Sequence, residues 1–273
     1  MGSRSATVSV PTSAVVTGAA RGIGRAVAER LVATGHRVVV TDVDAAAVAA
    51  TASEIGATGV VQDVRDPAAH REVAAAASGL APLGVWVNNA GVGFDGDLVD
   101  LSDDQVRGLV EINVLGVLWG MRTALDAFEA TGRGGQVVNV ASLSGLGPVP
   151  GLSVYAATKA AVVSITSSTA LEAPSGVGVH AVLPDGVATA MVEAMADGRG
   201  RHLVQSGGRL LGTEDIADAV VGLLGSRRVL RTVPAWRGGL MRGSSLAPSL
   251  AAPAMALFEK QGRRRTAPGS TPR

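Results

Sequence analysis

The sequence predicts a single α/β domain built on a doubly wound parallel sheet of about seven strands, with helices on both faces. Three observations predict this fold. Apolar, strand-like runs alternate with helix-like segments from residue 13 onward. A glycine-rich turn joins the first strand to the first helix. The chain has 273 residues, 47% of them hydrophobic and 17% charged, which is enough to bury a sizeable core.

The first strand, residues 14–17, leads through the glycine turn into a helix over residues 25–33. Gly18 permits a tight turn, Gly22 lets backbone N–H groups approach a pyrophosphate, and Gly24 allows close packing of helix on sheet. The helix N-terminus attracts phosphates. Because the spacing is Gly-x-x-x-Gly-x-Gly rather than the usual Gly-x-Gly-x-x-Gly, the turn alone indicates a dinucleotide site no better than an ordinary connection.

The second strand, Arg37–Asp42, ends on an acid about 20 residues after the glycine turn. The Asp42 carboxylate can accept both ribose hydroxyls of an adenosine and would repel a 2′-phosphate, which favours NAD over NADP. Alternatively, Asp42 and Asp44 only cap the next helix. Arg21, in the glycine turn, favours NADP because a cation there can meet a 2′-phosphate.

Later segments continue the alternation of strands and helices. We expect helices at 44–55, from 66, at 102–130 and at 154–170, and strands at 59–64, 84–88, 136–140 and 178–183. Two of these segments contain an amide in an apolar setting: Asn88 ends a buried strand, and Asn113 lies within the longest helix. A buried amide needs partners. Asn88 therefore either joins neighbouring strand ends or faces a ligand.

Tyr155 is the chain's one tyrosine, and Lys159 lies four residues later, on the same face of a predicted helix. An ammonium group close to a phenol lowers the phenol pKa from about 10, so Tyr155 can exchange a proton with an alcohol. Ser142, at the end of a strand, can stabilise charge that develops on a substrate oxygen. Taken alone, the Tyr155 and Lys159 spacing equally fits a surface pair.

Together these residues resemble the short-chain dehydrogenase/reductase family over residues 12–225. The shared motifs, in the family's order, are Thr17-Gly-x-x-x-Gly-Ile-Gly24, Asp63, Asn88-Asn-Ala-Gly91, Asn113, Ser142, Tyr155-x-x-x-Lys159 and Pro184-x-x-x-x-Thr189. The resemblance implies a Rossmann-like fold. It also implies an NAD(P)-dependent oxidoreductase that interconverts a secondary alcohol and a ketone by hydride transfer.

The resemblance implies four catalytic residues. Tyr155 would be the general acid/base, Lys159 would lower its pKa and hold the nicotinamide ribose, and Ser142 would polarise the substrate oxygen. Asn113 would fix a helix kink and a water in the proton relay. Asp63 would contact the adenine. The full implied cofactor set is Gly18, Arg21, Gly22, Ile23, Gly24, Asp42, Asp63, Val64, Asn89, Ala90, Gly91, Tyr155, Lys159, Pro184, Val187 and Thr189.

The chain divides into a flexible segment at 1–11, a dinucleotide-binding catalytic domain at 12–239 with a substrate-binding lid at 190–212, and a C-terminal extension at 240–273. The expected substrate pocket comprises Ser142, Leu143, Val149, Tyr155, Met191 and Met195. Its apolar walls favour an aliphatic, alicyclic or polyketide-like secondary alcohol and its ketone. No metal site is expected.

Two features depart from the family pattern. Asp185 stands where the family usually has glycine, and it can affect the substrate or only cap the turn. The family's C-terminal strand is not apparent, and residues 232–236 occupy its place. That weakens the case for a tetramer, while a homodimer through helices 102–130 and 153–172 stays plausible. We therefore expect a homodimer or homotetramer.

Composition narrows the partners and the location. Residues 226–273 carry ten Lys or Arg and one acid, a local charge of +9 in a chain of net charge +1. We expect this basic end to be disordered and solvated rather than to contact a membrane. Aromatic residues make up 3% of the chain, and we expect no nucleic-acid binding. The absence of cysteine, of a long apolar run and of a secretion signal predicts a cytoplasmic protein.

Two other functions remain open from the sequence. The first is an NADPH-dependent ketone reductase of a biosynthetic pathway, which Arg21 favours. The second is a non-catalytic nucleotide-binding sensor or scaffold, and the intact Ser142, Tyr155 and Lys159 argue against it.

Overall fold

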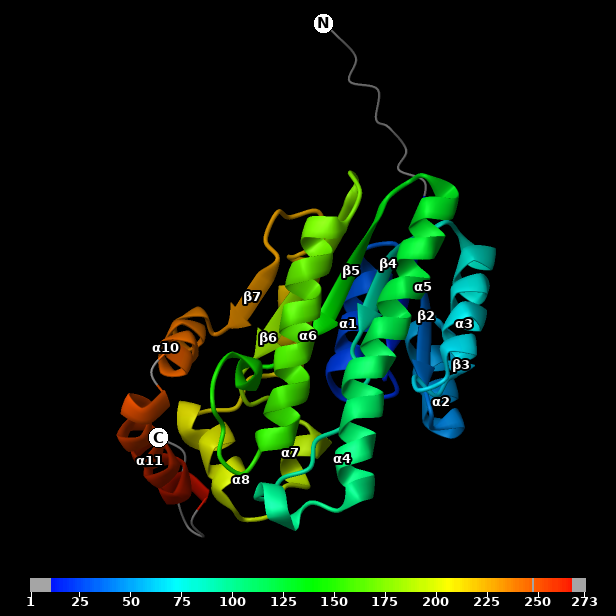
Figure 1. Cartoon of the computed structure of the whole chain (residues 1–273). Coiled ribbons are helices and arrows are strands. Elements are labelled where there is room, and N and C mark those ends of the chain that lie inside the picture. Colours follow the sequence, from blue (N-terminus) through cyan, green and yellow to red (C-terminus); the bar gives the residue numbers. More distant parts are fainter. Residues whose placement is uncertain (1–10, 247, 267–273) are drawn as a thin grey trace, which may run out of the picture.

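The computed structural model describes residues 11–246 and 248–266, so the predicted flexible segment lies, except for residue 11, outside the described residues. The fold is a seven-stranded parallel sheet, as predicted, and its strand order is β3-β2-β1-β4-β5-β6-β7 (Figure 1). The strands are β1 Ser13–Thr17, β2 Arg37–Asp42, β3 Thr58–Val61, β4 Leu83–Asn88, β5 Gly135–Val140, β6 Val177–Pro184 and β7 Leu230–Val233.

Helices cover both faces of the sheet because side chains alternate along each strand. On one face, Val38 and Val40 of β2 pack in a core with helices α1, α2 and α9. On the other face, Val39 packs in a second core with α3, α5 and α6. The helices are α1 Gly22–Ala33, α2 Ala45–Ile55, α3 Pro67–Leu80, α5 Gly116–Thr131, α6 Ser153–Glu172 and α9 Thr213–Val221.

Strand order reverses between β1 and β4, where the chain passes from one side of the sheet to the other. In sheets of this kind, the loops beside such a reversal diverge and leave a crevice at the carboxyl ends of the strands. The glycine turn after β1 and the Asn89 to Gly91 segment after β4 both lie there. The topology therefore places the two motifs next to each other.

The predicted helix at 102–130 is interrupted. A capping box of Ser102 and Gln105 starts α4, Asp103–Val110, as the sequence indicates. A π-helical segment, Glu111–Leu115, then joins α4 to α5. Within the described part of the chain, the whole stretch is the one helix long and apolar enough to span a membrane, but α5 packs on β4 and α3 in the core.

The C-terminal region differs from the expectation in one respect. The sequence showed no C-terminal strand of the family's kind, but the structure contains one: β7, Leu230–Val233, pairs in parallel with β6. Helices α10, Ala235–Leu246, and α11, Pro248–Thr266, follow it; α10 packs on β7, and α11 packs against residues 199–207 (Figure 1). Arg263 to Arg265 belong to α11, so disorder of the basic end stays a prediction for residues 267–273, outside the described residues.

Candidate active site

A cavity of about 1080 Å³ runs along the carboxyl ends of the strands, and its lining is largely apolar. It brings together twenty of the residues that the sequence analysis singled out. These are Gly18, Arg21, Gly22, Ile23, Asp42, Asp63, Val64, Asn89, Ala90, Gly91, Ser142, Leu143, Val149, Tyr155, Lys159, Pro184, Val187, Thr189, Met191 and Met195. Two others, Gly24 and Asn113, lie behind the wall rather than in it.

The glycine turn needs its glycines for two different reasons. Gly18 and Gly22 have φ angles of 62° and 60°, a left-handed backbone that favours glycine. A Cβ on Gly18 would also lie 2.6 Å from the Ala90 Cα atom. Gly24 does not line the cavity: a Cβ there would lie 2.4 Å from the Asn89 Nδ2 atom. Gly24 therefore allows the close packing expected of it, here of α1 on the segment after β4, while its contact with a cofactor stays a prediction.

The two asparagines at the end of β4, Asn88 in the strand and Asn89 just after it, hold strand ends together. Asn89 Nδ2 donates hydrogen bonds to the carbonyl oxygens of Thr17 at 2.9 Å and of Gly18 at 2.8 Å. Asn88 Oδ1 accepts from Trp86 Nε1, and Asn88 Nδ2 donates to Asn139 Oδ1, both at 2.8 Å. Of the alternatives for Asn88, the structure thus supports the joining of strand ends.

The three acids that follow β2 and β3 or end β2, Asp42, Asp44 and Asp63, have separate roles. Asp44, not Asp42, caps α2, since its Oδ1 atom accepts from the Ala47 N–H at 3.0 Å. Asp42 lines the cavity and accepts from the Ala20 N–H at 3.2 Å, which orients its carboxylate beside the glycine turn. Asp63 binds the Arg65 guanidinium, and this hydrogen bond lowers the pKa of the Asp63 carboxyl. Asp42 and Asp63 both line the cavity, so both carboxylates can face a ligand there.

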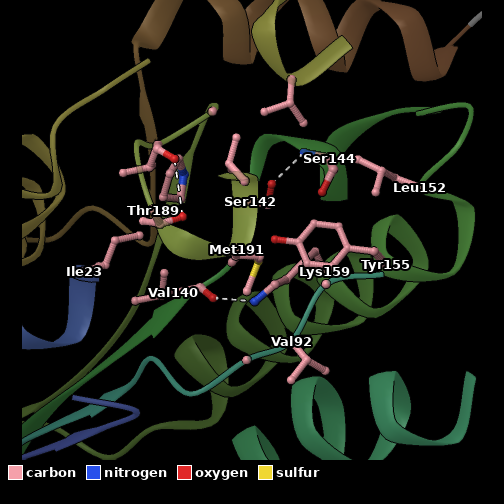
Figure 2. A pocket seen from close by; sticks show the side chains of 18 of the residues that line it. Ile23, Val92, Val140, Ser142, Ser144, Leu152, Tyr155, Lys159, Thr189 and Met191 are labelled. Atoms are coloured by element: carbon pink, nitrogen blue, oxygen red, sulfur yellow. Dashed lines mark hydrogen bonds between the residues drawn. The ribbon is translucent and has the colours of Figure 1, made fainter. Parts of the chain in front are cut away.

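Ser142, Tyr155 and Lys159 meet at the centre of the cavity (Figure 2). The Tyr155 hydroxyl points towards Ser142, which follows β5, and the Lys159 side chain passes beneath the phenol ring. Lys159 Nζ lies 5.7 Å from the centre of that ring and donates to the Val140 carbonyl oxygen at 2.9 Å. The helical spacing of the pair thus places both groups in the cavity, and the alternative of a surface pair is wrong.

Burial controls the charge of this pair. It raises the pKa of the Tyr155 phenol, and the Ser142 hydroxyl opposes that rise through a hydrogen bond. Burial also lowers the pKa of the Lys159 ammonium to about 8. Removal from water therefore disfavours the charged form of both groups, and the expectation that Lys159 lowers the phenol pKa stays a prediction.

Asn113 lies at the middle of the π-helical segment and is fully buried. Its Oδ1 atom accepts from the Val92 N–H at 2.9 Å, and its Nδ2 atom donates to the Val92 carbonyl at 2.9 Å and to Thr158 Oγ1 at 3.2 Å. The helix is therefore irregular at Asn113, whereas the kink that Asn113 was expected to fix stays a prediction. Its contacts tie α6 to the loop that lines the cavity, while the expected relay water stays a prediction.

The substrate end contains residues that the sequence analysis missed. Helices α10 and α11 add side chains to the cavity wall. Arg237 of α10 is among them, in an ion pair with Asp185, the residue already noted as a departure from the family pattern. The added apolar side chains are Leu240, Met241, Met255 and Phe258. Four of the chain's six methionines now line one cavity, which suits an apolar ligand of irregular shape. No local sequence signal indicates which face of these two helices turns inward.

Comparison with known proteins agrees with this geometry. The sequence model of the short chain dehydrogenase family matches residues 12–200. Sorbitol dehydrogenase of Cereibacter sphaeroides is 40% identical over 176 residues, which cover 63% of this chain and 69% of that protein. The 3-oxoacyl-[acyl-carrier-protein] reductase FabG of Escherichia coli is 32% identical over 216 residues, or 77% of this chain and 88% of that protein.

Two solved structures share this fold over most of the chain. The 3-ketoacyl-(acyl-carrier-protein) reductase of Brucella melitensis, complexed with NADH, has a TM-score of 0.74 and 31% identity over 81% of this chain and 96% of its own. A short chain dehydrogenase/reductase of Burkholderia phymatum, complexed with NAD, has a TM-score of 0.75 and 27% identity over 96% and 98%. With the Ser142, Tyr155 and Lys159 cluster, these matches show an oxidoreductase that acts on alcohols or ketones with NAD(P). The chain belongs to the short-chain dehydrogenase family.

Proposed function

We propose that this protein interconverts an apolar secondary alcohol and its ketone, with NAD(H) as the hydride carrier. The observation that carries the proposal is a single apolar cavity that contains the glycine turn at one end and the Ser142, Tyr155 and Lys159 cluster at its centre. A tight pyrophosphate site and a proton-transfer site that share one cavity support hydride transfer coupled to proton transfer.

The residues at the glycine turn fit a dinucleotide. The N-terminus of α1 opens beside the cavity with no acidic residue in its first turn and no side chain capping it. Its backbone N–H groups are therefore available to a pyrophosphate. Gly18, Gly22 and Ile23 would hold the phosphates, and Val187 and Thr189 the carboxamide. When bound, the cofactor supplies the acceptor or donor of the hydride.

The chain's own groups then handle the proton and the developing charge. Ser142 donates a hydrogen bond to the substrate oxygen and stabilises it as charge builds there. In alcohol oxidation the Tyr155 phenolate accepts the hydroxyl proton, and in ketone reduction the Tyr155 hydroxyl returns it. Lys159, held by the Val140 carbonyl, supplies the adjacent cation that favours the phenolate.

NAD is the proposed cofactor because the Asp42 carboxylate lies at the cavity edge where an adenosine ribose would sit, and it repels a 2′-phosphate. Arg21 lines the same end and is the feature that favours NADP. Dissociation constants for NADH and NADPH, measured by quenching of protein fluorescence, test the choice. We expect NADH to bind at least about tenfold more tightly. Tighter NADPH binding would support the ketone reductase of a biosynthetic pathway instead.

The apolar lining supports an aliphatic, alicyclic or polyketide-like substrate rather than a polyol, although the similar proteins include a sorbitol dehydrogenase. A panel of secondary alcohols and sugar alcohols with NAD, followed by NADH absorbance, tests this. We expect the apolar alcohols to be turned over faster. Faster turnover of sorbitol would contradict the substrate class. Tight NADH binding without any turnover would indicate the non-catalytic sensor.

A homodimer or homotetramer in the cytoplasm completes the proposal. The homodimer would use the outer faces of α4, α5 and α6. The absence of cysteine supports a reducing compartment. Light scattering on the purified protein measures the oligomeric state directly, and a monomer would contradict it.

A further inference from the structure

A buried ion pair links the catalytic domain to its last two helices. Arg237 Nε lies 2.7 Å from Asp185 Oδ2, and the two side chains are 10% and 15% exposed. Asp185 follows β6 immediately before the segment that ends at Thr189, and Arg237 lies in the first turn of α10. The pair thus joins the loop beside the proposed nicotinamide site to the C-terminal region.

Arg237 contacts more than its ion-pair partner. Its Nη2 atom donates to Ser206 Oγ at 3.1 Å, at the end of the lid. Its guanidinium carbon lies 5.9 Å from the centre of the Phe258 ring on α11. A Cβ on Gly207 would come within 2.7 Å of both Arg237 Nη1 and Asp185 Oδ2, so the chain passes directly over the pair. The Arg237 guanidinium therefore connects α10 to three other segments: the loop after β6, the turn at Ser206 and helix α11.

Helix α11 is fitted closely against the lid. A Cβ on Gly262 would lie 1.7 Å from the His202 carbonyl oxygen, in helix α8, Arg199–Val204. Arg265 Nη1 donates to the carbonyl oxygen of Ser206 at 2.8 Å, the same residue whose hydroxyl Arg237 binds. These contacts leave the Met255 and Phe258 side chains directed into the cavity. The C-terminal helices therefore form a wall of the substrate site and not a separate appendage.

We propose that the Asp185–Arg237 pair determines substrate specificity by position: it fixes α10 and α11 over the outer end of the cavity, where their apolar side chains favour long apolar substrates over short ones. Both are positioning residues, since they act through Met255, Phe258 and their neighbours. The proposal rests on the proposed alcohol oxidation with NAD. A short alcohol reaches Ser142 and Tyr155 without touching this wall, whereas a long one must lie along it.

The test compares Arg237→Met with wild type, using NAD with butan-2-ol and with decan-2-ol. Wild type is expected to have the higher kcat/KM with decan-2-ol. In Arg237→Met we expect that value to fall at least about tenfold, mainly through KM, while the value for butan-2-ol changes less than about threefold. Arg242→Met is the matched control, because Arg242 is exposed on the same helix, and it should leave both values unchanged.

A lone buried carboxylate can itself destabilise the fold, so a second variant separates the two effects. Asp185→Asn with Arg237→Met removes both charges; it should fold normally and still lose the preference for decan-2-ol. Arg237→Lys keeps a charge beside Asp185 but not the fork that also binds Ser206, and it should lie between wild type and Arg237→Met. An equal fall for both alcohols, or none, would overturn the proposal.

Amide hydrogen exchange separates failure of this proposal from failure of the proposed function. In Arg237→Met we expect the amides of α10 and α11 to exchange at least about tenfold faster than in wild type and in Arg242→Met. Unchanged exchange in these helices would overturn the positioning role, whatever the activity. A wild-type protein without turnover of any alcohol, but with faster exchange in Arg237→Met, would contradict only the proposed function.

Discussion

The two ends of the cavity are built in different ways. At the cofactor end, the contacts come from backbone groups and short side chains that directly follow strands, such as Gly18 after β1 and Asn89 after β4. At the substrate end, apolar side chains converge from the lid, α10 and α11, and Arg237 holds these segments together. The family match ends at residue 200, before those helices. The difference teaches that the groups proposed for the reaction lie on the sheet and the helices packed on it, whereas the proposed selection of the substrate depends on segments that follow β6.

Tyr155 lies where the two ends meet, and its replacement by Phe should have the largest effect. We expect kcat to fall by about 10²- to 10⁴-fold, because the proton then has no acceptor on the chain. NADH binding should stay unchanged, since the ring remains in place. Steady-state kinetics and an NADH titration measure the two quantities. A variant that kept most of its turnover would show that the phenol does not transfer the proton, and the proposed mechanism would be wrong.

Substitution at the cofactor end should weaken binding through the backbone. In Gly18→Ala we expect the affinity for NADH to fall by more than about tenfold and the stability by about 1–3 kcal/mol, because Cβ meets Ala90 in a left-handed turn. Gly35→Ala is the matched control: its φ of +91° carries similar strain, but nothing lies within 4 Å of the added atom. Equal NADH affinity in the two variants would contradict the close approach.

The pH dependence follows from the burial of Tyr155 and Lys159. Oxidation requires the phenolate, and burial raises the phenol pKa, so kcat/KM for an alcohol should rise about tenfold per pH unit from pH 6 towards 8. Above about 8 the Lys159 ammonium loses its proton, the phenolate loses its neighbouring cation, and the rise should flatten. Reduction needs the protonated phenol and should not rise with pH. Initial rates in both directions measure this, and an oxidation rate that falls between pH 6 and 8 would contradict it.

The cofactor end could be predicted because its signals are local in the sequence. The glycine turn and the spacing from Tyr155 to Lys159 each lie within one turn or helix, so strand and helix geometry alone bring those groups to the crevice. Asn113 was recognised as a buried amide. The π-helical segment was not, because it depends on hydrogen bonds to Val92 and Thr158 that only the folded chain brings together.

The substrate end could be predicted only in part. The sequence indicated Leu143, Val149, Met191 and Met195, which line the cavity, but not the side chains of α10 and α11, because their placement depends on contacts between distant parts of the chain. Arg237 and Asp185 are far apart in the sequence, and neither lies in a motif that indicates a pair. Pro253 suggests a break, yet α11 continues through it over Pro248–Thr266, packed against the lid. Which face of such a helix turns inward depends on tertiary packing, and the apolar positions of α11 do not reveal it.

The smallest expected effect tests the wall at a single side chain. Met255 and Leu257 lie two residues apart on α11; Met255 lines the cavity, whereas Leu257 is 65% exposed. We expect Met255→Ala to lower kcat/KM for decan-2-ol by about tenfold, because loss of apolar contact in a pocket costs about 1–3 kcal/mol, and to leave butan-2-ol unchanged. Leu257→Ala removes similar bulk from the same helix and should change neither value. If the two variants had the same kinetics, Met255 would not contact the substrate. Helix α11 would then not form the part of the cavity wall that selects the substrate.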